Sequence, residues 1–159
     1  MQLATVSSQF FTECKNHGTD KELFCDKAGR PCVLIINLIY KWQSCAFVVP
    51  LRSNISANAP KDQYFALPPN ASTQSGKRHG VHYIKMFPID KKYIQPYKIS
   101  KSGYLVMLKG ILDKNESKII NACQEYLDKY EKGLGSPMTP DIDGILSWLQ
   151  NGKVMRRDE

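Results

Sequence analysis

The chain has 159 residues, a length typical of one domain that can bury a core without disulfide or metal staples. Its hydrophobic fraction of 42% and charged fraction of 23% suit a soluble globular domain, and no apolar run is long enough to span a bilayer, which argues against a membrane protein. The net charge of +7 favours a polyanionic partner, although many small basic proteins have none. We expect one domain over residues 1–159 and no membrane contact.

The cysteines and the first residues both bear on the compartment. Five cysteines are an odd number and none stands in a C-x-x-C pair, which argues against a disulfide framework and a zinc site. We expect free thiols in a reducing compartment, with no metal and no cofactor. The segment Met1–Thr5 lacks the basic and then apolar layout of a secretory signal, so the sequence favours a cytoplasmic location.

The first elements in chain order are strands. Gln2–Ser7 predicts a short strand and Phe10–Lys15 a turn of helix. Two apolar, β-branched runs, Cys32–Ile39 and Ser44–Leu51, are joined by a short polar segment and predict a hairpin. Because both runs are nearly continuously apolar, we expect both faces to be covered, as in a small closed barrel with helices packed outside.

Loops and strands alternate after this hairpin. We expect a polar loop over Arg52–Asp62, a strand over Gln63–Leu67, a long polar loop over Pro68–Gly80 and a further strand over Val81–Ile89. A loop as long as the second one is usually functional or disordered in a compact domain. Asp90–Ile99 is a basic, tyrosine-rich connector.

Helical spacing of apolar residues begins at Ser102. The stripe belongs either to one bent helix or to two helices, with Asp113 and Glu116 as a capping box between them. A last helix is expected to open at Thr139 and to end at Gly152. Strands within residues 1–100 and helices within 101–152 predict an α+β domain.

Three short segments follow one another in a familiar order and spacing. They are Thr5–Phe11, Pro50–Asn54 and Lys85–Ile89, and helices complete the chain. In this arrangement the chain resembles the ToxN/AbiQ family of type III toxins, and within it the CptN-like branch most. The resemblance implies a compact antiparallel β-barrel core similar to the Kid/MazF toxins, with added C-terminal helices.

The resemblance also implies a function. Such a toxin is a metal-independent endoribonuclease that cuts single-stranded RNA by 2′-hydroxyl attack and leaves a 2′,3′-cyclic phosphate and a 5′-hydroxyl. Its expected partners are cellular mRNA and a repeated RNA pseudoknot antitoxin, which it cuts from a precursor and binds in a closed protein–RNA assembly during phage abortive infection.

The chain departs from the family pattern at the expected active-site loop. Family members often carry Pro-Leu-Thr-Ser-Pro-Lys, whereas this chain has Arg52, Asn54 and Ile55 in place of the threonine, the second proline and the lysine. Only Ser53 carries over directly. The aromatic residue after the first Ser-Ser pair is often tyrosine and here is Phe10, so no role that needs that hydroxyl is assigned.

RNA cleavage of this kind needs a base for the 2′ proton, a cation or donor for the phosphorane charge and an acid for the 5′ oxygen. Ser53 follows a buried strand, where a rigid scaffold presents a loop, and its hydroxyl can donate to a phosphate oxygen. Arg52 can grip a phosphate through two parallel hydrogen bonds. A turn-capping serine and an ordinary surface arginine are the alternatives.

A lysine and a histidine complete the expected catalytic set. Lys85 lies between apolar neighbours, so strand alternation can point it into a groove opposite the core or into solvent. His79, or alternatively His82, can serve as the acid or the base, because histidine transfers protons near neutral pH. Both can equally be passive members of a basic loop.

Further basic and aromatic residues form an expected RNA-binding set. Loop cations suit phosphate contacts, and tyrosines interleaved with lysines suit the stacking of unpaired bases, although such tyrosines are also common packing residues. The set comprises Lys27, Arg30, Asn54, Lys77, Arg78, His82, Lys91, Lys92, Tyr93, Tyr97 and Lys98. A non-catalytic RNA-binding barrel protein that regulates structured RNA would need the same surface, and a protein-interaction domain that uses the helices is a third possibility.

Overall fold

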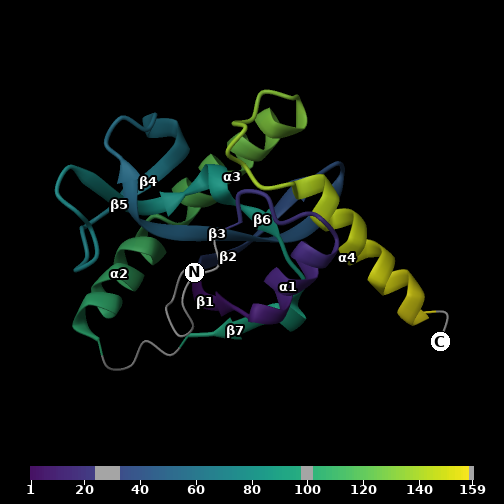
Figure 1. Cartoon of the computed structure of the whole chain (residues 1–159). Helices are drawn as coiled ribbons and strands as arrows, with labels where there is room; N and C mark the ends of the chain where they lie inside the picture. The colour runs from purple at the N-terminus through teal and green to yellow at the C-terminus, as the bar shows by residue number, and fades with distance from the viewer. Residues whose placement is uncertain (24–32, 98–101, 158–159) are drawn as a thin grey trace.

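The computed structural model describes residues 1–23, 33–97 and 102–157, with strands in the first part and helices in the last (Figure 1). The strands are β1 (Gln2–Val6), β2 (Val33–Tyr40), β3 (Gln43–Ser56), β4 (Tyr64–Leu67), β5 (Lys77–His82), β6 (Phe87–Pro88) and β7 (Ile94–Pro96). The α-helices are α1 (Ser8–Asn16), α2 (Gly103–Lys114), α3 (Glu116–Glu131) and α4 (Ile142–Arg157). Short 3₁₀ helices are η1 (Lys61–Gln63), η2 (Tyr83–Lys85) and η3 (Lys91–Tyr93).

The strands pair antiparallel in the order β4-β5-β3-β2-β1-β7, and β6 pairs with β3. The hairpin of β2 and β3 is confirmed, and its turn at Lys41 and Trp42 has φ angles of 48° and 68°. The long strand β3 links two parts of the sheet, because its first half pairs with β2 and Leu51–Ser56 pairs with β5.

The α+β class is confirmed, but the expected closed barrel is wrong. Along the part of the chain that the structure describes, β4 and β7 stand at the two ends of the sheet and do not pair with each other. The apolar runs of β2 and β3 are continuous because helices cover both faces of an open sheet.

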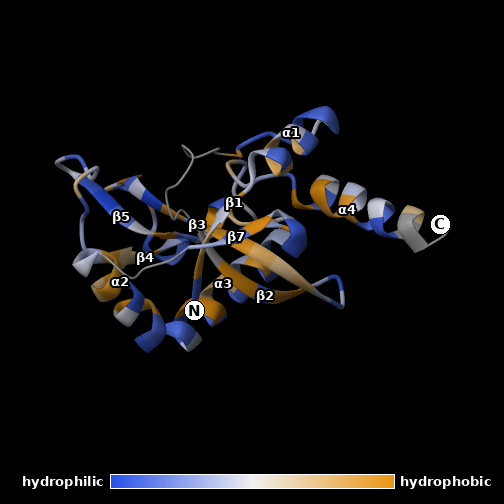
Figure 2. Ribbon diagram, turned by 90° about the horizontal axis from the view of Figure 1, so that it is seen from below, coloured by the Kyte–Doolittle hydropathy of each residue, from blue (hydrophilic) through white to orange (hydrophobic). Residues whose placement is uncertain are grey.

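Two clusters of buried side chains lie on the two faces. In β3, Phe47 and Val49 belong to one cluster and Val48 to the other, as strand alternation requires. The first cluster is closed by α2 and α3, for example through Leu112, and the second by α1 and α4, for example through Phe10. Figure 2 shows this layering, with α1 and α4 on one side of the strands and α2 and α3 on the other.

The boundaries around the two expected loops differ from the sequence prediction. β3 continues through Arg52 to Ser56, and β5 already begins at Lys77. Polar residues remain in strands here because the antiparallel ladder pairs their backbone groups. Gly80 permits a close approach of β4, since a Cβ at this position would lie 2.4 Å from the Phe65 carbonyl oxygen. Val81–Ile89 is not one strand: the chain turns through η2 before β6.

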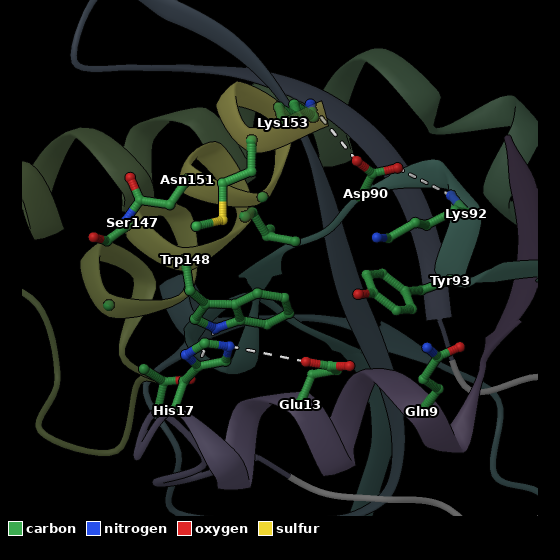
Figure 3. A pocket seen from close by; sticks show the side chains of 15 residues that line it. Gln9, Glu13, His17, Asp90, Lys92, Tyr93, Ser147, Trp148, Asn151 and Lys153 are labelled. Carbon is green, nitrogen blue, oxygen red and sulfur yellow. Dashed lines mark hydrogen bonds and ion pairs between the residues drawn. The ribbon is translucent and has the colours of Figure 1, made fainter. Parts of the chain in front are cut away.

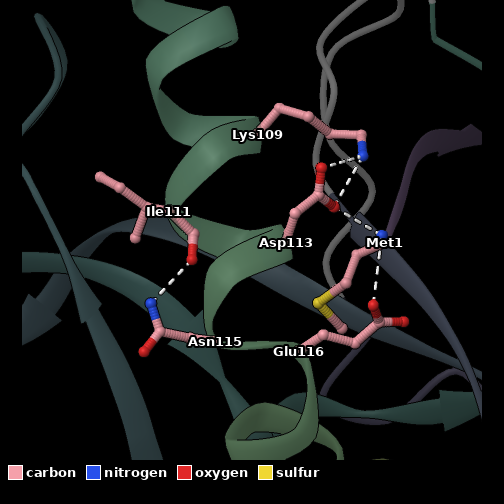
Figure 4. A network of polar contacts seen from close by, with 6 residues as sticks. All are labelled: Met1, Lys109, Ile111, Asp113, Asn115 and Glu116. Carbon is pink, nitrogen blue, oxygen red and sulfur yellow. Dashed lines mark hydrogen bonds and ion pairs between the residues drawn. The ribbon is translucent and has the colours of Figure 1, made fainter.

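The apolar stripe of the C-terminal part forms two helices. Asn115 separates α2 from α3, and its Nδ2 donates to the Ile111 carbonyl oxygen at 2.8 Å (Figure 4). The expected capping box of Asp113 and Glu116 is wrong, because Asp113 instead accepts from the Met1 amino group at 2.7 Å. This contact fixes the start of β1 against the end of α2.

The last helix is longer than predicted. It begins at Ile142 rather than at Thr139, after Asp141 Oδ1 accepts from the Gly144 backbone N–H at 3.1 Å. It runs past Gly152, which lacks the positive φ of a C-cap glycine. None of the helices in the described segments has the length and apolarity needed to cross a bilayer.

Candidate functional site

The first candidate residues, Arg52 and Ser53, lie at a β-bulge. In the ladder between β3 and β5, Arg52 pairs with Gly80 and Ile55 pairs with Arg78. Two residues of β3, Ser53 and Asn54, therefore stand opposite one residue of β5. A bulge re-aims side chains and is common beside active sites, so this irregularity distinguishes the expected site from the regular ladder around it.

Residues of the loop between β4 and β5 form hydrogen bonds with both bulge residues. Asn70 Nδ2 donates to Ser53 Oγ at 2.9 Å, Asn54 Nδ2 donates to the Ser72 carbonyl oxygen at 3.1 Å, and the Gln74 backbone N–H donates to Asn54 Oδ1 at 2.8 Å. Because the Asn70 bond uses a lone pair of the Ser53 oxygen, the serine proton is left to donate to a phosphate. Asn54 is occupied in shaping the loop.

Arg52 and His82 share one face of the sheet. Arg52 pairs with Gly80, and His82 lies two residues further along β5, so both side chains leave the sheet on the same side. His82 is 5% exposed, and neither of its ring nitrogens has a hydrogen-bond partner among the described residues. Burial, followed by the charges of Arg52 and Lys85, lowers the pKa of His82 to about 4. The imidazole is therefore neutral near pH 7.

The expected placement of Lys85 on a groove-facing strand is wrong. Lys85 lies in η2 and is 1% exposed, because the chain turns there and its side chain runs inward. Its Nζ donates to Glu22 Oε2 at 2.7 Å and to the Met138 carbonyl oxygen at 2.8 Å. The hydrogen bond and then the charge of Lys85 lower the pKa of Glu22. These contacts give Lys85 a structural role and place a second positive charge near His82.

The expected catalytic role of His79 is likewise not supported by its position. Its side chain points to the face opposite Arg52 and His82, toward α2. Its Nδ1 lies 2.7 Å from the Pro68 carbonyl oxygen and 3.1 Å from the Tyr104 hydroxyl. His79 thus anchors the start of the β4–β5 loop, and we assign it no proton transfer.

The expected RNA-binding residues do not form one group. Lys77 and Arg78 are exposed on β5 beside the bulge, whereas Lys91 and Lys92 are exposed on η3. Tyr93, which was expected to stack on a base, is 3% exposed, and its ring packs against Phe10 and Trp148. Besides Asn54 and His82, described above, the remaining members are the half-buried Tyr97 and three residues outside the described ranges, Lys27, Arg30 and Lys98.

Sequence reasoning missed two residues that shape this site. Asn70 could have been found, because its side chain forms local hydrogen bonds with Ser72 and Thr73 of the kind that Asx turns make. Glu22 gives no local signal, since it meets Lys85 only in the folded chain. Within the described segments, no group of three His, Cys, Asp or Glu side chains is arranged to hold a metal ion.

The chain is similar to known proteins in its structure rather than in its sequence. No protein-family profile and no curated protein sequence matches the chain. A solved structure from work on a bacterial antiviral system regulated by a processed non-coding RNA is similar to it, with a TM-score of 0.70, 17% identity, and coverage of 92% of this chain and 96% of that chain.

A second solved structure comes from work on bacterial type III toxin–antitoxin systems, in which a non-coding RNA pseudoknot selectively inhibits the toxin. It has a TM-score of 0.68 and 18% identity, and the alignment covers 96% of this chain and 97% of that chain. Both alignments span nearly the whole of each chain, so the likeness is not confined to one motif. This chain has the fold of these two proteins.

Proposed function

We propose that this chain is a metal-independent endoribonuclease that acts as the toxin of a type III toxin–antitoxin system. The fold it shares with two proteins of RNA-regulated bacterial systems supports this proposal, as does its net charge of +7. In the cytoplasm the enzyme cuts cellular mRNA. A repeated RNA pseudoknot, which the toxin also processes and binds in a closed assembly, holds it inactive.

In the proposed reaction, His82 takes the proton of an RNA 2′-hydroxyl. The 2′ oxygen then attacks the adjacent phosphorus, the bond from phosphorus to the 5′ oxygen breaks, and the 5′ oxygen takes a proton from water. A cyclic phosphate and a 5′-hydroxyl result. Arg52 neutralises charge on the phosphorane oxygens and Ser53 donates a hydrogen bond to one of them. The low pKa leaves a ring nitrogen of His82 unprotonated at neutral pH and able to accept this proton, although it also makes the imidazole a weaker base than an ordinary histidine.

The bulge in β3 is the observation that carries this proposal. It sets Arg52, whose charge acts on the buried His82, next to Ser53, whose oxygen is held by Asn70. A cation and a neutral imidazole are thereby held on one face of paired strands, and the hydroxyl belongs to the next residue along β3, which suits the preorganised stabilisation of a phosphorane.

The test is incubation of the purified protein with single-stranded RNA in excess chelator, followed by analysis of the fragment ends. We expect cyclic phosphate and 5′-hydroxyl ends, and a rate lowered by about 10²-fold in Ser53→Ala. Ser56→Ala, at the exposed end of the same strand, is the matched control and should cleave normally. Equal rates in Ser53→Ala and the wild type would remove Ser53 from the mechanism.

One observation favours a second candidate function, a non-catalytic RNA-binding protein. Two of the four expected catalytic side chains, Lys85 and His79, are engaged in structural hydrogen bonds. Such a protein would retain the RNA in the chelator experiment and leave it uncut, and its affinity would fall steeply with salt.

A further inference from the structure

A cavity of about 650 Å³ lies between α1, η3 and α4, away from the bulge in β3. None of its lining residues belongs to β3 or β5. Figure 3 shows side chains from these three elements pointing into a common space, with Trp148 on one side and Lys92 and Tyr93 on the other. The volume is sufficient for one nucleotide, since small-molecule sites begin near 300 Å³.

One wall of this cavity is a rigid aromatic surface. The Trp148 indole Nε1 donates to Thr19 Oγ1 at 3.1 Å, which fixes the ring. The His17 imidazole stacks on the indole with centroids 5.0 Å apart and planes 5° apart, and its side chain is 47% exposed. Tyr93 meets the indole edge-on, with centroids 6.3 Å apart. Stacked aromatic side chains of this kind bind unpaired nucleobases through their π-faces.

The rest of the wall supplies hydrogen-bonding groups of both charges. The Glu13 carboxylate faces the cavity from α1, and its Oε2 lies 3.8 Å from His17 Nε2. The Lys92 ammonium lies 4.8 Å from the centre of the Tyr93 ring and points into the same space. Lys153 of α4 lies 3.7 Å from Asp90 and is 67% exposed. Two carboxylates, Glu13 and Asp90, and two ammonium groups, Lys92 and Lys153, therefore surround the aromatic wall.

We propose that this cavity binds an unpaired guanine nucleotide of RNA. Guanine presents an oxygen acceptor beside two N–H donors along one edge, which Lys92 and Glu13 complement, while its plane stacks on the outer face of His17, itself stacked on Trp148. Lys153 lies at the rim, where the phosphate of the nucleotide meets a positive charge. The choice of RNA rests on the proposed function, and the site adds a base preference at a distance from the cleavage site.

Tryptophan fluorescence tests this site directly. The chain has two tryptophans, and Trp42 is 98% exposed, so Trp42→Phe leaves Trp148 as the reporter without disturbing the core. Titration with guanosine, adenosine, cytidine and uridine 5′-monophosphates should change the Trp148 emission, with guanosine monophosphate bound at least about tenfold more tightly than the others. Glu13→Gln in the same background should weaken guanosine monophosphate binding about tenfold, whereas Glu125→Gln on α3 should not.

Three results of the titrations with the four nucleotides would overturn the inference. Absence of a fluorescence change, equal affinity for all four nucleotides, or a guanine preference that persists in Glu13→Gln would each do so. Failure of the proposed function is a separate result. If the protein binds guanosine monophosphate but cuts no RNA, the proposed function fails and the guanine site stands. If it cuts RNA but binds none of the four nucleotides, the guanine site fails and the proposed function stands.

Discussion

Replacing Arg52 with alanine is expected to lower the rate of RNA cleavage by about 10²- to 10³-fold. Arg52 directly precedes the bulge residue Ser53, and its side chain lies on the same face as His82. Its removal takes away the positive charge that the phosphorane needs, and an uncharged methyl group cannot replace it. Single-turnover cleavage of a labelled RNA in chelator measures the effect on the chemical step apart from binding.

The Arg52→Ala result needs a control for charge and a control for stability. Lys129→Ala removes one positive charge from α3, where Lys129 is exposed and pairs with Asp62 at 3.5 Å, and should cleave within a few-fold of the wild type. The thermal midpoint of Arg52→Ala must stay above the assay temperature. A folded Arg52→Ala variant that cleaves at the wild-type rate would contradict the proposed site.

Acidification is expected to destabilise the protein through His82. Its pKa falls on folding from 6.5 to about 4, so between these values the unfolded chain takes up a proton that the folded chain does not. The free energy of unfolding should therefore fall as the pH falls, by about 2 kcal/mol between pH 6.5 and about pH 5 and by about 3 kcal/mol at pH 4. Above about pH 7.5 the histidine contributes almost no slope, because it is then neutral in both states.

Urea unfolding of the wild type and of His82→Gln at several pH values isolates this contribution. Carboxylates such as Glu22 and Asp113 have pKa values that are lowered by their lysine or N-terminal partners. The free energy of unfolding that they contribute is lost mainly below the pKa values of the unfolded chain, 4.5 and 3.8. They are common to both proteins and cancel in the difference. If His82→Gln kept the full wild-type slope between pH 5 and pH 6.5, the burial of a neutral His82 would be refuted.

Local patterns in the sequence were sufficient to predict most of the strands and helices. The β2–β3 hairpin followed from two apolar runs, and the helical stripe after Ser102 followed from its spacing. The closed barrel was wrong because an apolar run reports only that both faces are covered, and here helices on both sides of an open sheet cover them. The ends of β3 and β5 were wrong because pairing across strands keeps polar residues in a ladder.

The candidate site depends on contacts between segments that are far apart in the sequence, and the spacing of residue types along the chain cannot predict such contacts. Strand alternation placed Lys85 outside the core, but a 3₁₀ turn carries it inward to Glu22 and Met138. His79 and His82 were equivalent in the sequence, and the ladder separates them onto opposite faces. A bulge has no sequence signature at Ser53, so only the register between β3 and β5 reveals it.

The chemistry of the RNA backbone tests the central claim most directly. An RNA in which only the nucleotide before the cut carries a 2′-hydrogen in place of the hydroxyl should bind as well as the unmodified RNA and remain uncut, in chelator as in buffer, since the attacking oxygen is absent. Cleavage of that substituted RNA at the same bond would contradict attack by the 2′-hydroxyl, and with it the roles proposed for Arg52, Ser53 and His82.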